Sequence, residues 1–468
     1  MQIPIIKGDK IRNGPETDYR DALPVNMFAV RKDILKAKGY MMCWDGITKK
    51  TDVIGSDRGG IYNDRQSAHY RVSGEKFISV DTDGTISQLG DVTGISQVAL
   101  AYSFNTQCIV ANGNAYLYDA STGFRQITDV NIGAPIDVEW INQLYVFTDG
   151  EYIYHTSTSD ESVIEPDAFA TAEFMPDVSL GVAKTSDNKL MVMGRYSLEY
   201  FTFQDVSTGF KFRRIEARGQ KFGIVATHAK CEIQGSWYFT GGHKKEPVTV
   251  YKVKTGQSEK ISTREIDKIL AQYSEPDLAN MRMEGYSKDD VTFILIHLPN
   301  ETLCYNETIA QSMGTVNAWS ILHSNATGSP YTAINVIFDP RSGEWLVGDK
   351  SSNVLGYLDN SVFTQYDVLQ EWQLFSPILK LEGKSIHEME LETIPGHSPY
   401  NDATVAVSAT FDGLTYSQEF WQTYGSPNNY DTRFLIRNVG YIEHIVGYKF
   451  RGATKSRMSF AFLNVEYD

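Results

Sequence analysis

The sequence lacks the features that mark exported, membrane-spanning or metal-binding proteins. It has no run of about 18 apolar residues, and its first residues lack the charged-then-apolar pattern of a secretory signal. We therefore expect a soluble protein that is made in a cytoplasm and has no membrane-spanning segment. The four cysteines lie far apart, without CxxC pairs or histidines at ligand spacing, which predicts reduced, buried thiols and no metal site: Cys43, Cys108, Cys231 and Cys304.

Catalytic motifs are also missing. The chain has no phosphate-binding loop, no nucleophile elbow, no dinucleotide-binding glycine pattern and no HExxH, and its nine histidines are scattered. These absences predict no cofactor and no enzyme activity. One alternative stays open, a β-propeller glycosidase acting on host surface sugars, because paired carboxylates can cleave glycosidic bonds. The acidic part of the chain, however, offers only Arg125 where sialidase-like sites need three arginines.

Charge is distributed unevenly along the chain. The formal net charge of −15 argues against a protein that grips nucleic acid, because such binding depends on lysines and arginines that displace counterions. Between Asp81 and Leu180 there are fifteen acids and one base, whereas sixteen bases face nine acids between Lys184 and Lys268. This asymmetry suggests one acidic face and one basic face.

A short basic cluster stands out within the second of these segments. Five bases alternate with apolar residues: Lys211, Arg213, Arg214, Arg218 and Lys221. The pattern is typical of a strand with one solvated face, and it also fits a protein interface better than a nucleic-acid site. We take the five residues as candidates for a partner interface, with a plain solvated face as the alternative.

A repeated unit runs through the middle of the chain. Each copy is an apolar strand, a turn with Gly, Asn or Asp, and a second apolar strand. The copies begin 36 to 54 residues apart, at Ala68, Gln107, Gln143, Lys189, Ser236, Asp290 and Glu344. A four-stranded propeller blade needs about 40–50 residues and buries its faces only against neighbouring blades. The repeat therefore predicts an all-β fold with a closed β-propeller of about seven blades.

Other patterns predict a second domain and a few helices. After about residue 373 the chain alternates apolar and polar residues at period two, which predicts an antiparallel β-sandwich with a hairpin turn at Asp412 and Gly413. We expect an N-terminal segment (1–50) that closes or flanks the propeller, the propeller itself (51–372) and the C-terminal sandwich (373–468). Short helices are expected from Ser262, with a Ser262/Glu265 capping box, and from Val30 to Gly39.

Several stretches together carry a family resemblance over the whole length. They are DYRDALPVNMFAVRKDILKAKGY (Asp18 to Tyr40), DGITKK (Asp45 to Lys50), AHYRVSGEKF, GDVTG, GRYSLEYF, ISTREIDKIL, FILIHLPNETLCY and RNVGYIEHIVGYKFRG (from Arg437). In this order the sequence resembles the tail-hub family of enterobacterial short-tailed phages, the packaged-DNA stabilisation proteins. The specificity lies in the collinearity, because each stretch alone could be an ordinary strand.

The resemblance implies a structural virion protein of the tail and no catalytic residues. It implies a homo-oligomeric ring of six copies that joins the portal-adaptor ring to the tail needle and to tailspikes or tail fibres, and that retains packaged DNA. The charge pattern is compatible with this role, because an acidic lumen would let DNA pass without tight binding. The candidates for that lumen are Asp137, Glu139, Asp149, Glu151, Asp160, Glu161, Glu165 and Asp167.

Overall fold

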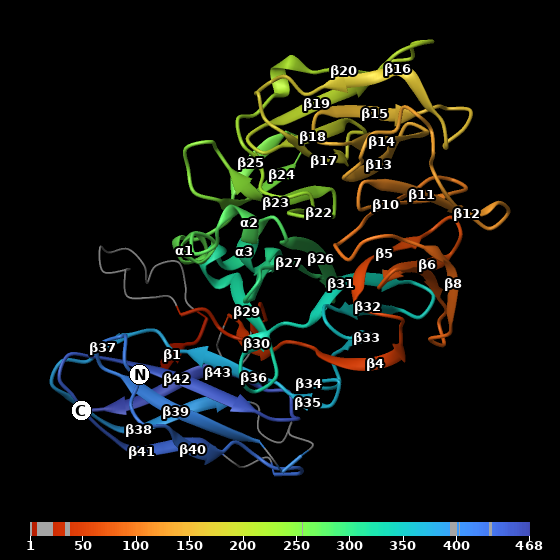
Figure 1. Ribbon diagram of the computed structural model, residues 1–468. Coiled ribbons are helices and arrows are strands. Elements are labelled where there is room, and N and C mark those ends of the chain that lie inside the picture. Colours follow the sequence, from red (N-terminus) through yellow and green to blue (C-terminus); the bar gives the residue numbers. More distant parts are fainter. Residues whose placement is uncertain are drawn as a thin grey trace.

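The structure is a computed structural model that describes residues 2–6, 22–32, 38–254, 256–393, 400–401, 403–429 and 433–468. Strands dominate, and they form a ring of small sheets beside a two-sheet sandwich (Figure 1). The predicted all-β propeller and sandwich with few helices is therefore confirmed.

Seven mainly antiparallel sheets form the propeller in the described part of the chain. The first blade contains β5 (Asp57–Asn63), β6 (Ala68–Ser73), β7 (Lys76–Val80) and β8 (Ile86–Asp91). The second contains β9 (Ala99–Tyr102), β10 (Gln107–Ala111), β11 (Asn114–Asp119) and β12 (Gly123–Gln126). The third contains β13 (Asp137–Ile141), β14 (Leu144–Thr148), β15 (Tyr152–Thr156) and β16 (Ile164–Thr171).

The next three blades continue in chain order. The fourth blade contains β17 (Ser179–Lys184), β18 (Leu190–Gly194), β19 (Leu198–Phe203) and β20 (Phe212–Arg214). The fifth contains β21 (Gly223–Ile224), β22 (Lys230–Ile233), β23 (Ser236–Gly242), β24 (Thr249–Lys254) and β25 (Gln257–Lys260). The sixth contains β26 (Arg282–Lys288), β27 (Val291–His297), β28 (Thr302–Asn306), β29 (Trp319–Ser324) and β30 (Ser329–Pro330).

The sequence repeat corresponds to the central hairpin of each blade. Its seven starting points fall at, or one residue before, these strands: β6, β10, β14, β18, β23, β27 and β32. Central strands have neighbours on both edges and on both faces, so they are the most apolar part of a blade. Strands β14 and β18, for example, are buried at every residue. The outer strands carry the polar residues and give a weaker sequence signal.

The two ends of the propeller meet in its seventh blade. This blade joins β31 (Ala333–Asp339), β32 (Glu344–Asp349) and β33 (Val354–Asp359) to β4 (Gly46–Asp52), with β34 (Thr364–Gln365) and β35 (Val368–Leu369) beside them. Strand β4 runs antiparallel to β33, from Asp359 opposite Gly46 to Val354 opposite Asp52. The ring is therefore closed by main-chain hydrogen bonds between segments about 300 residues apart in sequence.

The sandwich contains strands from both ends of the chain. One sheet holds β36 (Glu371–Phe375), β37 (Leu379–Lys380), β39 (Thr404–Thr410), β40 (Phe420–Thr423) and β42 (Ile445–Ala453). The other holds β38 (Lys384–Thr393), β41 (Phe434–Ile442) and β43 (Ser459–Tyr467), extended by the N-terminal β1 (Gln2–Pro4), β2 (Met27–Val30) and β3 (Tyr40–Cys43). The N-terminal segment thus contributes three strands to the sandwich before β4 enters the propeller.

Polar contacts fix the sandwich against the sixth blade. Asn26 has a left-handed φ of 51°, and its side-chain amide donates to the Glu371 carbonyl at 2.7 Å and accepts from the His323 N–H at 2.9 Å. Asp45, between β3 and β4, accepts from the Tyr286 hydroxyl at 3.0 Å and from Arg457 at 2.7 Å. Each residue therefore ties the propeller to the sandwich.

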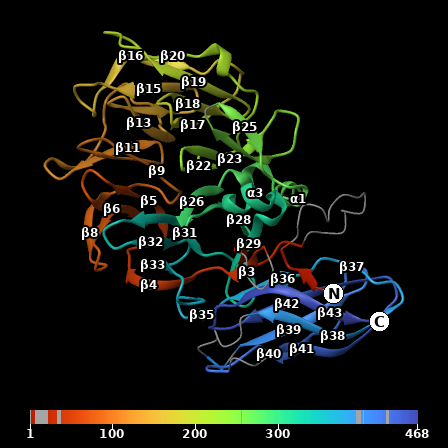
Figure 2. The ribbon, with the colours of Figure 1, turned by 180° about the vertical axis from the view of Figure 1, so that it is seen from behind.

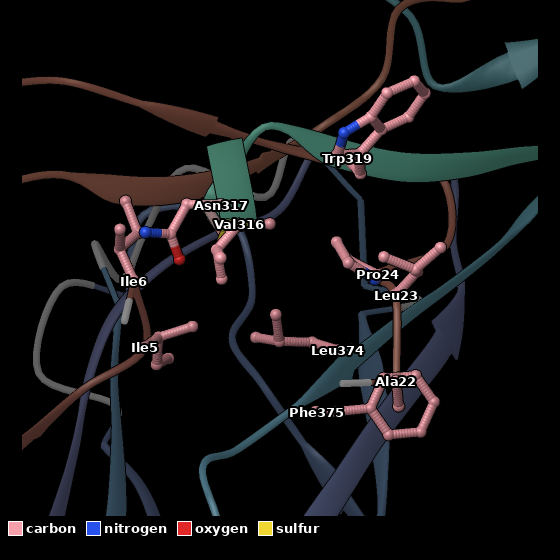
Figure 3. Close-up of a pocket in the computed structure, with 11 residues that line it drawn as sticks. Ile5, Ile6, Ala22, Leu23, Pro24, Val316, Asn317, Trp319, Leu374 and Phe375 are labelled. Carbon is pink, nitrogen blue, oxygen red and sulfur yellow. The ribbon is translucent and has the colours of Figure 1, made fainter. Parts of the chain in front are cut away.

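An apolar pocket of about 50 Å³ lies at the same junction (Figure 3). Ile5 and Ile6 face Leu374 from one side, Leu23 and Pro24 flank it, and Trp319 of the sixth blade stands at its upper rim. These residues belong to one hydrophobic core that runs from the fifth and sixth blades into the sandwich. The two folds are thus packed against each other and not merely linked.

The helix predictions need correction. Helix α1 spans Arg264–Leu270, but its N-cap is Thr263 without a side-chain cap bond, so the expected Ser262/Glu265 capping box is absent. Ser262 instead donates to the Asp267 carboxylate at 2.7 Å. A capping box forms at the next helix, α2 (Glu275–Leu278), where Ser274 and Asp277 satisfy each other's backbone N–H groups.

Two further local predictions have mixed outcomes. The helix expected from Val30 to Gly39 begins on a residue of β2, and residues 33–37 lie outside the described residues. The turn at Asp412 and Gly413 forms, with Asp412 accepting from the Leu414 and Thr415 N–H groups at 2.7 and 2.8 Å. The return strand β40 begins only at Phe420, so the connection is a longer loop than a two-residue hairpin. A third helix, α3, spans Glu307–Met313.

No helix in the described ranges is long and apolar enough to cross a membrane.

Ring closure leads to a test of stability. Ile47 of β4 is 1% exposed, whereas Ile54, two residues after that strand, is 43% exposed. Replacing Ile47 with Ala should lower the free energy of unfolding by about 2–4 kcal/mol, because it opens a cavity in the closing strand. Ile54→Ala should change it by less than about 0.5 kcal/mol. Urea unfolding followed by tryptophan fluorescence measures both, and equal effects would contradict the closing role of β4.

Candidate functional site

The first strands of six blades surround a polar cavity of about 370 Å³ at the propeller axis. Its charged lining comes from β13, β22, β26 and the residues just before β22: Asp137, Glu139, His228, Lys230, Glu232, Arg282 and Glu284. A volume of this size holds at most a small molecule. This cavity is far too small to hold a DNA duplex.

The acids in this cavity are held by neighbouring blades. Asp137 of the third blade forms an ion pair with Lys230 of the fifth blade and accepts from the Val182 N–H of the fourth at 2.8 Å. Lys230 also donates to the Val182 carbonyl at 2.9 Å. One ion pair therefore connects three successive blades near the axis.

Glu139 lies beside this pair and has an unusual pKa. It accepts from the N–H groups of Trp140 at 3.0 Å and Lys184 at 3.2 Å. Burial raises its pKa to about 7, although Lys230 and the two backbone donors act in the opposite direction. Asp137 and Glu139 both accept hydrogen bonds from an adjacent blade. They therefore stabilise the contact between blades and do not form a free catalytic pair.

A second polar network joins the first blade to the seventh. Arg71, fully buried on β6, donates to the Asp57 carboxylate at 2.5 Å and to the carbonyls of Asn335 and Leu346 at 2.7 and 3.1 Å. The Asn335 amide donates to the other oxygen of Asp57 at 2.5 Å. Burial raises the pKa of Asp57, and Arg71 opposes that rise. The network crosses the seam where the ring closes.

The sixth blade is fastened to the seventh in the same way. Glu284 accepts from the His297 ring at 2.6 Å and from the Val336 N–H of β31 at 3.1 Å. Burial lowers the pKa of His297 to about 4 and outweighs the opposing effect of Glu284. Sequence analysis missed these networks; the available signal was a charged residue inside an otherwise apolar strand, as in Arg71 of β6.

The eight predicted lumen acids do not form one cluster. Asp137 and Glu139 line the axial cavity, while the other six lie on the third blade away from it. Asp149 and Glu151 form the β14–β15 turn, Asp160 and Glu161 the loop before β16, and Glu165 and Asp167 belong to β16 itself. Asp149 accepts from the Glu151 and Tyr152 N–H groups at 3.0 and 2.8 Å, so turn formation explains part of the acidic composition.

The predicted basic cluster lies on the next blade. Strand β20 and the 3₁₀ turn Glu216–Arg218 carry it, and both views place β20 beside β16 (Figures 1 and 2). A hydrogen bond of 3.1 Å from the Lys211 N–H to the His155 ring joins the two blades there. The acidic and basic segments are thus neighbours in space and not opposite faces.

Most of the basic cluster is already occupied within the chain. Lys211 is 8% exposed, because Phe210 and Phe212 pack against His155 at this point, so it cannot serve a docking surface. Arg214 pairs with Glu216 at 2.8 Å and with buried Glu199 at 3.4 Å. Arg218 pairs with Asp187 at 2.9 Å. Arg213 and Lys221 are the exposed members of the five.

The cysteines and the possible metal ligands form no metal-binding group in the described part of the chain. All four cysteines are buried and unpaired, and burial raises the pKa of the Cys43 thiol to about 12. Within the described ranges, no group of three or more His, Cys, Asp or Glu side chains is arranged to hold a metal ion.

The fold is a β-propeller joined to a β-sandwich. The charged side chains near the propeller axis form ion pairs and hydrogen bonds that hold neighbouring blades together. Comparison with known proteins gives the family. Residues 1–363 match the family model "Bacteriophage P22 Gp10, beta-propeller", and residues 371–468 match "Bacteriophage P22 Gp10, beta-sandwich". The chain is 31% identical over 483 residues to the tail hub protein gp10 of Salmonella phage P22, covering 98% of both chains.

The chain belongs to the P22 Gp10 family of phage stabilisation and tail hub proteins. This family consists of structural proteins of the virion tail and not of enzymes, so the glycosidase alternative is set aside. The predicted family resemblance is confirmed over the whole chain.

Solved structures show more distant likeness. Virginiamycin B lyase from Staphylococcus aureus matches with a TM-score of 0.44 and 12% identity, over 67% of this chain and 98% of that one. The N-terminal domain of Nup159 matches with a TM-score of 0.42 and 10% identity, over 72% and 98% of the two chains. Neither likeness bears on function.

The network at the closing seam can be tested by removing its cation. Arg71→Met leaves the buried Asp57 carboxylate without its partner and should lower the free energy of unfolding by about 3–5 kcal/mol. The exposed Arg213→Met serves as control and should cost less than about 0.5 kcal/mol. Chemical denaturation of both variants gives the two values. A small loss for Arg71→Met would show that the network does not hold the seam.

Glu139 predicts a pH dependence of stability. Its folded-state pKa of about 7 lies above the ordinary value of 4.5, so the folded protein binds more protons than the unfolded chain between these values. Stability should therefore fall as the pH rises from about 4.5 to 7, by about 3 kcal/mol for this group. Glu139→Gln should flatten that part of the profile. Denaturation between pH 4 and 8 tests this, and parallel profiles would disprove it.

Proposed function

We propose that the protein forms the hub of a short phage tail, as a ring of six copies between the portal-adaptor ring and the tail needle, with tailspikes or tail fibres attached around it. In this role the ring retains packaged DNA and forms part of the ejection conduit. The observation that carries the proposal is the collinear match of both domains to the tail hub protein of phage P22.

The dimensions of the axial cavity support a conduit between copies. The axial cavity has a volume of about 370 Å³ and is lined by side chains that hydrogen bonds and ion pairs hold in place. It has no room for a duplex within one propeller. A passage for DNA must then run along the axis of a ring of copies. The propellers would serve as rigid wall elements, since each is closed on itself by β4.

The charge of the protein supports passage without adhesion. A net charge of −15 disfavours tight contact with phosphates, and two of the five cations of the basic cluster, Arg214 and Arg218, are paired with acids of the same chain. We propose that the exposed acids of the third blade face the DNA path. Arg213 and Lys221 remain candidates for docking a partner ring.

Two measurements test this function together. Heads assembled without the protein should package DNA and then lose it, so that the genome becomes sensitive to nuclease. The purified protein should bind duplex DNA poorly even at 0.01 M salt, where the Debye length is about 30 Å and any attraction is exaggerated. Fluorescence anisotropy measures the affinity. Protein-deficient heads that keep their DNA, or tight salt-sensitive DNA binding, would contradict the proposal.

A further inference from the structure

The outer end of the sandwich carries an exposed apolar surface that neither the cavity nor the charge pattern explains. We call it the β40 patch, defined by side chains that are each 40–56% exposed: Phe411, Leu414, Tyr416, Phe420 and Trp421. They come from β40 and from the loop before it, within eleven residues of sequence. Five large exposed apolar side chains within so short a segment differ from the scattered single residues that a protein surface normally carries, and such groups mark interaction sites.

Cations of strand β42, which is separated from β40 by β39, lie over two of the aromatic rings. The Arg451 guanidinium lies 5.0 Å from the Trp421 ring centroid and pairs with Glu371 at 2.8 Å and with Glu419 at 2.5 Å. Lys449 lies 5.9 Å from the ring of Tyr416. Tryptophan, tyrosine and arginine are the residue types that dominate binding energy at protein interfaces. The patch therefore has the composition of a docking surface.

Strand β40 is also a sheet edge. The sheet order is β36, β42, β39, β40, and among the described residues β40 pairs with β39 alone. Neighbouring side chains of a strand point to opposite faces, so Phe420 and Trp421 present one aromatic ring on each face of this edge. An edge of this form can receive an extended segment by main-chain hydrogen bonds, with side chains packing on both faces.

A small cavity beside the patch offers an anchor position. It has a volume of about 120 Å³ and is lined by Phe375, Ile378, Leu414 and Tyr448, among others. Polar residues line it as well, Thr410 among them, and the buried Tyr448 hydroxyl has no hydrogen-bond partner among the described residues. A cavity near 150 Å³ has room for a molecule as large as benzene. One apolar or aromatic side chain of a partner would fit.

The size of the patch distinguishes between possible occupants. An aromatic side chain buries about 150–250 Å², so five half-exposed side chains offer roughly 400–600 Å². A stable interface between two globular surfaces needs about 800 Å² from each partner. The patch is too small to hold a second copy of this chain by itself. It matches a single extended strand that adds to β40.

We infer that β40 and its patch bind an extended, apolar segment of another tail protein, which adds as a strand to the edge of the sandwich. The inference rests on the proposed tail-hub function, which supplies the partner class. The docked segment would place apolar side chains against Phe420 and Trp421 and one side chain in the cavity beside Tyr448.

Binding of three purified probes tests the inference: the adaptor, needle and tailspike proteins of the same phage, each measured separately by biolayer interferometry. One of them should bind the wild-type chain, and Phe420→Ser/Trp421→Ser should weaken that binding at least tenfold. Tyr441→Ser, on the exposed edge strand of the other sheet, is the matched control and should leave it unchanged. Hydrogen exchange of residues 420–423 should slow in the complex.

A second variant shows whether weaker binding could come from unfolding of β40. Phe411→Ser/Leu414→Ser changes the loop and leaves β40 intact, and it should also weaken binding while the thermal unfolding midpoint stays constant. If both double variants bind the partner as tightly as the wild-type chain, the inference is overturned and the proposed function still stands. Self-association that depends on these residues would also overturn it, by making a second copy the occupant. Failure of all three probes to bind would count against the proposed function as well.

Discussion

The pairing of β4 with β33 is the constraint on which the rest of the structure depends. Each blade of a propeller buries its faces only against its neighbours, so an open ring would leave two blade faces exposed to water. Because the closing strand comes from residues 46–52 and its partner from 354–359, the ring cannot form until both ends of the domain are present. The hydrogen bonds from Arg71 to the carbonyls of Asn335 and Leu346 and the Lys230–Asp137 ion pair then connect blades near the axis.

The same N-terminal segment determines how the two domains are joined. Strands β1 to β3 extend a sandwich sheet, and the chain then passes Asp45 and enters the propeller as β4. A movement of the sandwich would therefore pull on the strand that closes the ring. Asn26 and Asp45 reinforce this coupling through hydrogen bonds to both domains.

Much of the fold could be predicted from the sequence, because the central hairpins of the blades are apolar and evenly spaced. Period-two alternation likewise predicted the sandwich. A closed ring with an N-terminal segment that closes or flanks it was predicted, but the pairing of β4 with β33 and the entry of β1 to β3 into the sandwich were not, since strand pairing between distant segments leaves no local pattern. The capping box was assigned to Ser262, although only the structure shows that Thr263 begins the helix and that Ser274 has the reciprocal bonds.

Site residues were harder to predict than the fold. A count of charges cannot show that Asp149 closes a turn, that Lys211 is buried or that Arg214 is paired with Glu199. Charge acts through its surroundings, and these depend on which blades become neighbours. In the sequence, the aromatic residues of β40 look like those of any strand. Only the structure shows that this strand lies at the edge of its sheet.

A single-particle reconstruction of the phage tail, resolved to individual strands, tests the central claim most directly. The account predicts copies of the propeller and sandwich in a ring below the portal adaptor, with the DNA path on the ring axis and between the copies. Density for this chain outside the tail, or a DNA path through the axis of one propeller, would contradict it.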